Sequence, residues 1–192
     1  MQFQDVPPID VESGLLRRAR QVPSPNHDER PQGIVAELIV VHGISLPPDE
    51  FGGPWIDALF TNSLPPDQHP YFATIADRRV SSHLLIRRDG EVVQYVPFHR
   101  RAWHAGVSSF LGREKCNDFS IGIELEGADT IAYEPEQYLA LTGAIIELCR
   151  AYRSLSLDRI AGHSDIAPGR KSDPGPAFDW IRLHALLRAH RA

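Results

Sequence analysis

Residues 34–41 constrain the fold of this chain more than any other stretch, because they form a nearly continuous apolar run rich in β-branched side chains. Such a run predicts a strand that is buried on both faces. His42 follows the run directly, and we expect Gly43 to break the strand. Ligands collect at the carboxyl ends of strands in open α/β sheets, so His42 is a candidate functional residue.

Further strands and helices are predicted along the chain. Asp89-Gly90 lies between two apolar runs, which is typical of a β-hairpin. Residues 119–125 alternate as in a strand, and Gly122 within them predicts the close approach of another backbone. Local sequence pattern predicts helices over residues 54–60, 136–152 and 178–190, and a short strand over residues 160–161.

These elements predict an α/β fold in a single domain. A chain of 192 residues fits one domain with a real core. We assign this domain to residues 34–192. Residues 1–33 are polar and proline-rich, and we expect them to form an extended leader packed on the domain surface.

Charge and hydropathy exclude several classes of protein. The net charge is −5 and no basic stripe is present, which argues against nucleic-acid binding. No stretch approaches the roughly 18 apolar residues of a membrane span. The N-terminus has neither the basic nor the apolar region of a signal peptide, so we expect a cytoplasmic protein.

Residues 162–175 combine three glycines and two prolines with several chemically active side chains. This composition is incompatible with a regular helix and predicts a shaped loop. Zinc accepts imidazole and carboxylate ligands, and a catalytic site keeps three of them. We hypothesise that His42, His163 and an aspartate form such a set, with Lys171 beside the metal. Spacing favours Asp173 over Asp165 only slightly.

Glu124 lies in the middle of an apolar strand, where an ionisable side chain needs an explanation. A salt bridge to an arginine, or a strand face open to water, would account for it. The alternative is a general base that faces a cavity, since burial raises the pKa of a carboxyl group. Glu126 points to the same face of the strand but lies at its end, where we expect its side chain to be more exposed to solvent.

Five segments in order resemble the AmpD-type amidases. They belong to the type 2 zinc N-acetylmuramoyl-L-alanine amidases, a family that also includes phage T7-type lysozyme and the peptidoglycan recognition proteins. The segments are residues 40–56, 80–90, 101–108, 116–127 and 162–175, and the resemblance extends over roughly 34–185. It implies a T7 lysozyme-like fold, in which a central mixed β-sheet is flanked by helices and long loops surround a zinc cleft.

The resemblance also implies the residues of the site. One Zn²⁺ per chain would be held by His42, His163 and Asp173, with Glu124 as general base and Lys171 beside the developing oxyanion. Substrate-binding residues would be the cations Arg79 and Lys115, which meet the acidic stem peptide, and the cleft-lining residues Trp103, His104 and Ala105.

The implied reaction is hydrolysis of the amide between the (1,6-anhydro)N-acetylmuramyl lactyl group and L-alanine. A monomer would act on anhydromuramyl peptides in cytoplasmic peptidoglycan recycling, and so indirectly limit β-lactamase induction. Two alternatives are a secreted amidase that acts on intact murein and a non-catalytic peptidoglycan-binding module. The complete set of expected ligands, base and lysine argues against the second alternative.

Two positions depart from the family pattern. Gly43 replaces the asparagine that usually follows the first zinc histidine, and Lys115 replaces an arginine. The lysine keeps the charge but loses the bidentate geometry of a guanidinium group. We expect both departures to affect peptide binding and not the hydrolytic chemistry.

Overall fold

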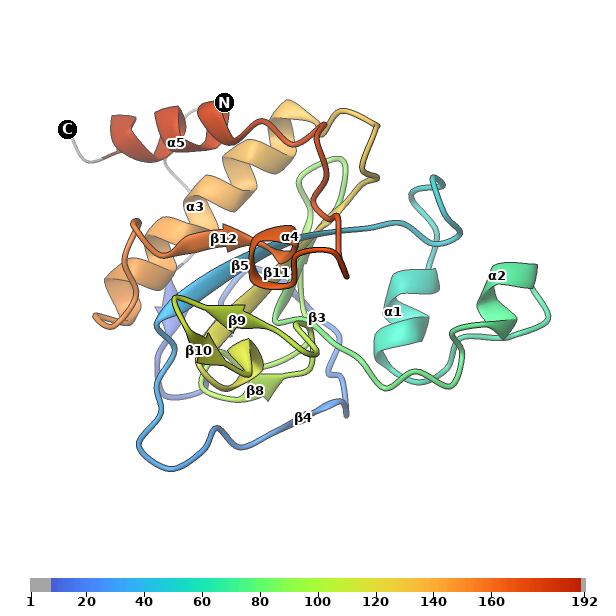
Figure 1. Ribbon diagram of the computed structural model, residues 1–192, viewed down its shortest axis with the longest axis horizontal. Helices are drawn as coiled ribbons and strands as arrows, with labels where there is room; N and C mark the ends of the chain where they lie inside the picture. The colour runs from blue at the N-terminus through green and yellow to red at the C-terminus, as the bar shows by residue number, and fades with distance from the viewer. Residues whose placement is uncertain (1–7, 191–192) are drawn as a thin grey trace.

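A computed structural model describes residues 8–190, so residues 1–7 of the predicted leader lie outside the described part. The chain folds around a six-stranded mixed sheet (Figure 1). Its strands, in sheet order, are β12 (Ile160–Gly162), β5 (Leu38–Ile44), β11 (Ser120–Glu126), β6 (Leu84–Ile86), β7 (Val92–Gln94) and β3 (Arg20–Gln21). The predicted α/β fold with a central mixed sheet is confirmed.

Strand direction in this sheet brings several carboxyl ends to one edge. β12, β5, β11 and β6 run parallel to one another, while β6 and β7 form the antiparallel hairpin predicted around Asp89-Gly90. The register pairs Glu124 of β11 with His42 of β5. Paired residues of neighbouring strands project from the same face, so the sheet itself places these two side chains side by side.

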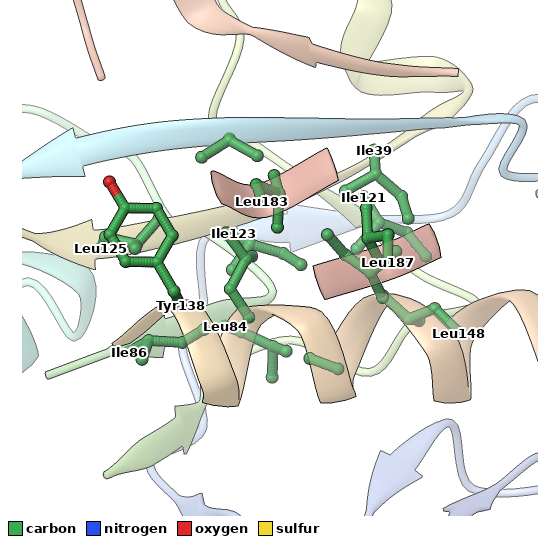
Figure 2. Close-up of a cluster of buried hydrophobic side chains, with 14 of the residues drawn as sticks. Ile39, Leu84, Ile86, Ile121, Ile123, Leu125, Tyr138, Leu148, Leu183 and Leu187 are labelled. Atoms are coloured by element: carbon green, nitrogen blue, oxygen red, sulfur yellow. The ribbon is translucent and has the colours of Figure 1, made fainter. Parts of the chain in front are cut away.

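Two helices, α3 (Pro135–Ala151) and α5 (Trp180–Ala189), pack on one face of the sheet (Figure 1). Figure 2 shows the core between the sheet and these helices, in which side chains from the central strands contact both helices. Strand residues such as Ile121 and Ile123, and helix residues such as Leu148 and Leu183, are fully buried. Each such side chain contributes about 1.5–3 kcal/mol on burial, so this face anchors the sheet.

The opposite face carries shorter elements and the long loops. The helices α1 (Trp55–Phe60) and α2 (Pro70–Ala73) cover a second apolar cluster with Leu85 and Val93. A third cluster surrounds Leu38 and Val40 of β5. It lies beside the short strands β8 (Arg101–Ala102), β9 (Ser109–Phe110) and β10 (Arg113–Glu114), a 3-10 helix (Cys116–Asp118) and the helical turn α4 (His163–Ile166).

The described part of the leader, from residue 8, contributes four short strands, β1 (Ile9–Asp10), β2 (Leu15–Leu16), β3 and β4 (His27–Asp28). β3 pairs with β7 and extends the central sheet, while β4 pairs with β8. Arg30 is largely buried and donates hydrogen bonds to the carbonyl oxygens of Asn117, Asp118, Phe98 and Ser120. The leader is therefore fastened to the segment that precedes β11.

Two local predictions are wrong. β5 begins at Leu38 and continues through Gly43 to Ile44, because β11 pairs with it along its whole length. The 162–175 segment begins with the helical turn α4 before its loop. Within residues 8–190, no helix has the length and apolar character needed to cross a membrane.

Candidate metal centre and active site

Three potential metal ligands converge at the carboxyl edge of the sheet. His42 Nδ1 lies 2.9 Å from His163 Nδ1 and 3.2 Å from Asp173 Oδ2. His163 Nδ1 lies 3.0 Å from the same carboxylate oxygen. All three side chains are buried or nearly so. Two nitrogens and one oxygen therefore point at a common centre.

Neighbouring strands bring the two histidines together. His42 lies in β5, and His163 directly follows β12, which runs parallel to β5. The loop after α4 then folds back, and the amide of Ser164 donates to the carbonyl oxygen of Asp173 at 2.9 Å. Asp165 is turned away from this centre and accepts a hydrogen bond from the Gly162 amide at 2.7 Å. Asp173, and not Asp165, thus meets the histidines.

The three ligand atoms fit a divalent metal with the preferences of zinc. Ligands at the usual zinc bond lengths of 2.0–2.2 Å are roughly 3.3–3.6 Å apart in a tetrahedron. The three observed separations, 2.9, 3.0 and 3.2 Å, approach these values. Two imidazoles and one carboxylate also match the three-ligand set of catalytic zinc sites.

Electrostatics prepares the same residues for a cation. Burial lowers the pKa of His42 to about 4, although Asp173 opposes this shift. Burial would raise the pKa of Asp173, but the close approach of His163 and His42 outweighs it and holds this pKa well below its usual range. Near neutral pH the cluster thus offers a neutral imidazole and an ionised carboxylate, the forms that bind metals.

Glu124 projects from β11 on the face that carries His42. Its side chain is only 8 % exposed, and its Oε2 has no hydrogen-bond partner among the described residues. Burial, and then the negative charge of Asp173, raise its pKa well above the usual range, while Lys171 opposes the shift. The salt bridge that would have explained this residue is therefore not found between 8 and 190.

Glu126 forms the ion pair that Glu124 lacks. Contrary to the prediction, Glu126 is only 2 % exposed. Its Oε1 accepts hydrogen bonds from the Gly52 amide at 2.7 Å and from Arg87 at 3.2 Å. The loop that contains Gly52 and the end of β6 cover the strand end, which is why the predicted exposure is wrong.

A cleft of about 550 Å³ opens beside the cluster of His42, His163 and Asp173. Lys171 lies at its edge, with 42 % of its side chain exposed and its Nζ 3.9 Å from Asp173 Oδ1. The predicted site residues that line this cleft are Trp103, His104, Glu124, His163, Lys171 and Asp173. The cleft is large enough for a small-molecule ligand.

The other predicted substrate-binding residues lie elsewhere. Ala105, which was expected to line the cleft, is fully buried and is not among the lining residues, because its carbonyl oxygen lies against His163. Arg79 is exposed and donates to the carbonyl oxygen of Ala76, while its neighbour Arg78 lines the cleft. Lys115 adopts a left-handed backbone conformation and lines a separate hollow of about 520 Å³ together with Arg170.

Trp103 owes its place at the cleft to the leader. Its indole Nε1 donates to Asp28 Oδ1 at 3.2 Å, and Asp28 belongs to β4, which pairs with β8 next to Trp103. Arg101 donates to both carboxylate oxygens of Asp28. The sequence did not reveal this link, because the leader carries no motif that points to the cleft.

Two glycines make room for side chains of the site. A Cβ atom on Gly43 would lie 2.3 Å from the hydroxyl of Tyr133, which donates to the carbonyl oxygen of Pro174 at 2.9 Å. Gly43 thus leaves space for a tyrosine that supports the loop of Asp173. A Cβ on Gly122 would lie 2.5 Å from the His104 ring, so the predicted close approach is made by a side chain and not by a backbone.

Comparison with known proteins places this site in a family. The N-acetylmuramoyl-L-alanine amidase family matches residues 32–176. The chain is 63 % identical to the 1,6-anhydro-N-acetylmuramyl-L-alanine amidase AmpD of Enterobacter cloacae, over 92 % of this chain and 94 % of that protein.

Solved structures agree with this result. A selenomethionine AmpD crystal structure superposes with a TM-score of 0.90 at 60 % identity, and covers 93 % of this chain and 98 % of its own. AmpDh3 of Pseudomonas aeruginosa, solved in complex with an anhydromuramic pentapeptide, is 28 % identical with a TM-score of 0.58, over 79 % of this chain and 59 % of its own. The chain therefore belongs to the N-acetylmuramoyl-L-alanine amidase family and is an amidase.

Proposed function

We propose that this amidase hydrolyses the bond between the lactyl group of 1,6-anhydro-N-acetylmuramic acid and L-alanine. The observation that carries the proposal is a buried Glu124, whose Oε2 has no hydrogen-bond partner among the described residues, in a cleft that two members of the His42–His163–Asp173 cluster also line. This combination provides a metal and a base for the same water molecule. The high identity to AmpD, and the anhydromuramic pentapeptide in the related AmpDh3 complex, support this class of substrate.

His42, His163 and Asp173 would hold one Zn²⁺ per chain. Bound zinc supplies a Lewis acid that acidifies water and polarises an amide carbonyl. Burial lowers the pKa of His42 and the neighbouring histidines lower the pKa of Asp173, so that no proton competes with the cation at these two groups near neutral pH. The limited exposure of the cluster keeps these charges away from bulk solvent, where they would be screened.

Glu124 would act as the general base. Its carboxylate takes a proton from the attacking water and later delivers this proton to the departing amine of L-alanine. An amine leaves poorly unless it is protonated, so both transfers are needed in one turnover. The raised pKa of Glu124 suits this exchange, because it makes the carboxylate a stronger base than a solvent-exposed glutamate.

Lys171 would stabilise the negative charge that develops on the amide oxygen. Its ammonium group lies at the cleft beside Asp173, and its flexible side chain reaches the space above the cluster. Trp103 would pack against the substrate at the cleft wall. Arg79 and Lys115 remain candidates for contacts to the acidic stem peptide, because both are exposed cations, although they lie outside the cleft.

We place the reaction in the cytoplasm, where a monomer would act on anhydromuramyl peptides released from the wall. Cell fractionation tests this location, and recovery of the protein in the periplasm would contradict it. Sedimentation of the purified protein tests the monomer.

The proposed reaction is tested by mass spectrometry of the products formed from anhydromuramyl-tripeptide. We expect free anhydro-N-acetylmuramic acid and intact tripeptide, no products after treatment with a chelator, and recovery on adding Zn²⁺. Cleavage within the peptide, or full activity in the chelated protein, would contradict the proposal.

A further inference from the structure

A single two-residue segment, His104–Ala105, contacts both metal-binding histidines on the side away from the metal. The His104 ring lies against His42, with Nδ1 2.9 Å from His42 Nε2. The carbonyl oxygen of Ala105 lies 3.2 Å from His163 Nε2. The segment thus controls the ring nitrogen that each histidine does not direct at the ligand cluster.

Ser120 and the Cys116 carbonyl oxygen fix the directions of the hydrogen bonds at His104. The carbonyl oxygen of Cys116 can only accept, so the Ser120 hydroxyl donates its one proton there, at 2.5 Å. Ser120 Oγ then accepts from His104 Nε2 at 3.1 Å. His104 Nδ1 is left with a lone pair, and it accepts the proton of His42 Nε2.

With the hydrogen bonds in these directions, the lone pair of His42 is on Nδ1, the atom that faces His163 and Asp173. His163 reaches the same state by a shorter route. The Ala105 carbonyl oxygen can only accept, and it lies closer to His163 Nε2 (3.2 Å) than the Arg170 guanidinium does (3.4 Å). We therefore assign the proton of His163 to Nε2 and the lone pair to Nδ1. Arg170 also donates to this oxygen, at 2.6 Å, and holds it in place.

The His104–Ala105 segment is itself fixed from below. Asn117 Oδ1 accepts hydrogen bonds from the His104 amide at 3.1 Å and from the Ala105 amide at 2.7 Å. Gly122 of β11 lies directly against the His104 ring, where any larger residue would push the ring away. His104 and Ala105 therefore have little freedom to rotate or shift.

We propose that His104 is a positioning residue that holds His42 in the tautomer required for metal binding, with Ser120 fixing the proton on His104. The same segment holds His163 through the Ala105 carbonyl oxygen. The inference rests on the metal site of the proposed function. It assigns His104 to the support of the metal ligand and not to substrate binding.

The tautomer of His104 can be read directly. Long-range ¹H–¹⁵N spectra of the zinc-loaded protein should show His104 as a neutral ring with its proton on Nε2. A proton on His104 Nδ1 would overturn the proposal, because that nitrogen could not then accept from His42. This measurement needs no substitution, so it decides even where a variant fails to fold.

Zinc affinity, measured by competition with a chromophoric chelator, tests the energetic role. His104→Leu removes the acceptor for His42 and should weaken zinc binding about 10- to 100-fold, the usual cost of losing an outer-shell partner. His104→Asn keeps an acceptor oxygen near the position of Nδ1 and should recover much of this loss.

Gly122→Ala perturbs the same contact differently, since it displaces the ring and leaves every hydrogen-bonding group in place. We expect it to weaken zinc binding as well. His83→Asn is the matched control. His83 is a buried histidine whose ring lies near His104, but its Nδ1 accepts a hydrogen bond from the Gly122 amide and its Nε2 contacts the Arg100 carbonyl oxygen and Arg30. It should lower stability without changing the zinc affinity of the folded protein.

Two outcomes of these substitutions would also overturn the proposal. One is an unchanged zinc affinity in folded His104→Leu and Gly122→Ala proteins. The other is a His104→Asn protein in which KM for the muropeptide rises while zinc affinity stays the same, which would make His104 a substrate contact. A normal tautomer and normal zinc effects without any hydrolysis by the wild-type protein would instead contradict the proposed function alone.

Discussion

Glu124 and Glu126 lie two residues apart on the same strand and project from the same face, yet their surroundings are opposite. Glu126 accepts hydrogen bonds from Arg87 and from the Gly52 amide. Glu124 borders the cleft with one oxygen unpartnered within the described part of the chain. Strand phase therefore does not distinguish a structural carboxylate from a reactive one. The segments that pack around each glutamate side chain make that distinction.

The difference separates two uses of a buried charge. At Glu126 the arginine and an amide offset the cost of burial, so the group contributes to stability. At Glu124 the cost is not offset, and it appears as a raised pKa. We therefore expect substitutions on the cleft side to impair chemistry and substitutions at Glu126 to impair folding. The following predictions test this division.

The largest effect is expected at Asp173, the carboxylate of the metal cluster. Asp173→Ala should lose both bound zinc and detectable activity, because it removes one of three ligands. Metal content measured by atomic emission and product formation by mass spectrometry check this. Asp165→Asn is the matched control from the same loop and should keep its zinc. If only the control lost its zinc, Asp165 and not Asp173 would be the metal ligand.

Glu124→Gln should lower kcat about 10²- to 10⁴-fold, the usual contribution of a general base, and should keep its zinc. A zinc-free Glu124→Gln protein would contradict the assignment, because Glu124 is not among the metal ligands.

The pH dependence of Glu124 has a definite sign. Its pKa in the folded protein lies above the usual value, so the wild-type rate should fall as pH drops through this raised pKa, and the acidic limb should vanish in Glu124→Gln. The protonated form favours folding at low pH, and this stabilisation is lost as pH rises through the folded pKa. Urea denaturation of the zinc-free protein at several pH values should therefore show that the free energy of unfolding falls less with rising pH in Glu124→Gln than in the wild type.

Lys171→Met should lower kcat by about 10²–10³, the usual cost of one donor to an oxyanion, with little change in KM. Steady-state kinetics on anhydromuramyl-tripeptide measure both constants. A rise in KM at constant kcat would show that Lys171 only holds the substrate.

Glu126→Gln should have the smallest effect on catalysis and should act on stability. Arg87 keeps Asp57 and Glu91 as partners, so we expect a loss of roughly 1–3 kcal/mol in the free energy of unfolding. The folded variant should keep its kcat and zinc content. A loss of kcat comparable to that of Glu124→Gln would break the distinction between the two carboxylates.

Much of the fold could be predicted from local pattern. The buried strand, the hairpin at Asp89-Gly90 and the two long helices follow from apolar spacing and turn residues, which act over a few neighbours. Element ends were less predictable. β5 extends past Gly43 because β11 pairs with it there, and sequence spacing does not report pairing.

The site divides in the same way. Residue type and position indicated His42, His163 and Glu124, since each follows or interrupts an apolar strand. The choice between Asp173 and Asp165 needed the resemblance to a family, and the roles of Asn117, Ser120 and Asp28 needed the structure. These residues act through hydrogen bonds between segments that are distant in the chain.

Side-chain type and short-range periodicity are sufficient to predict which groups are available for chemistry and which strands carry them. The folded structure was needed to show which carboxylate is paired, which nitrogen of His42 faces the cluster, and that the His104 ring contacts His42. Each of these depends on the direction of a contact between segments brought together by the parallel sheet. The register that pairs Glu124 with His42 is the physical origin of the site.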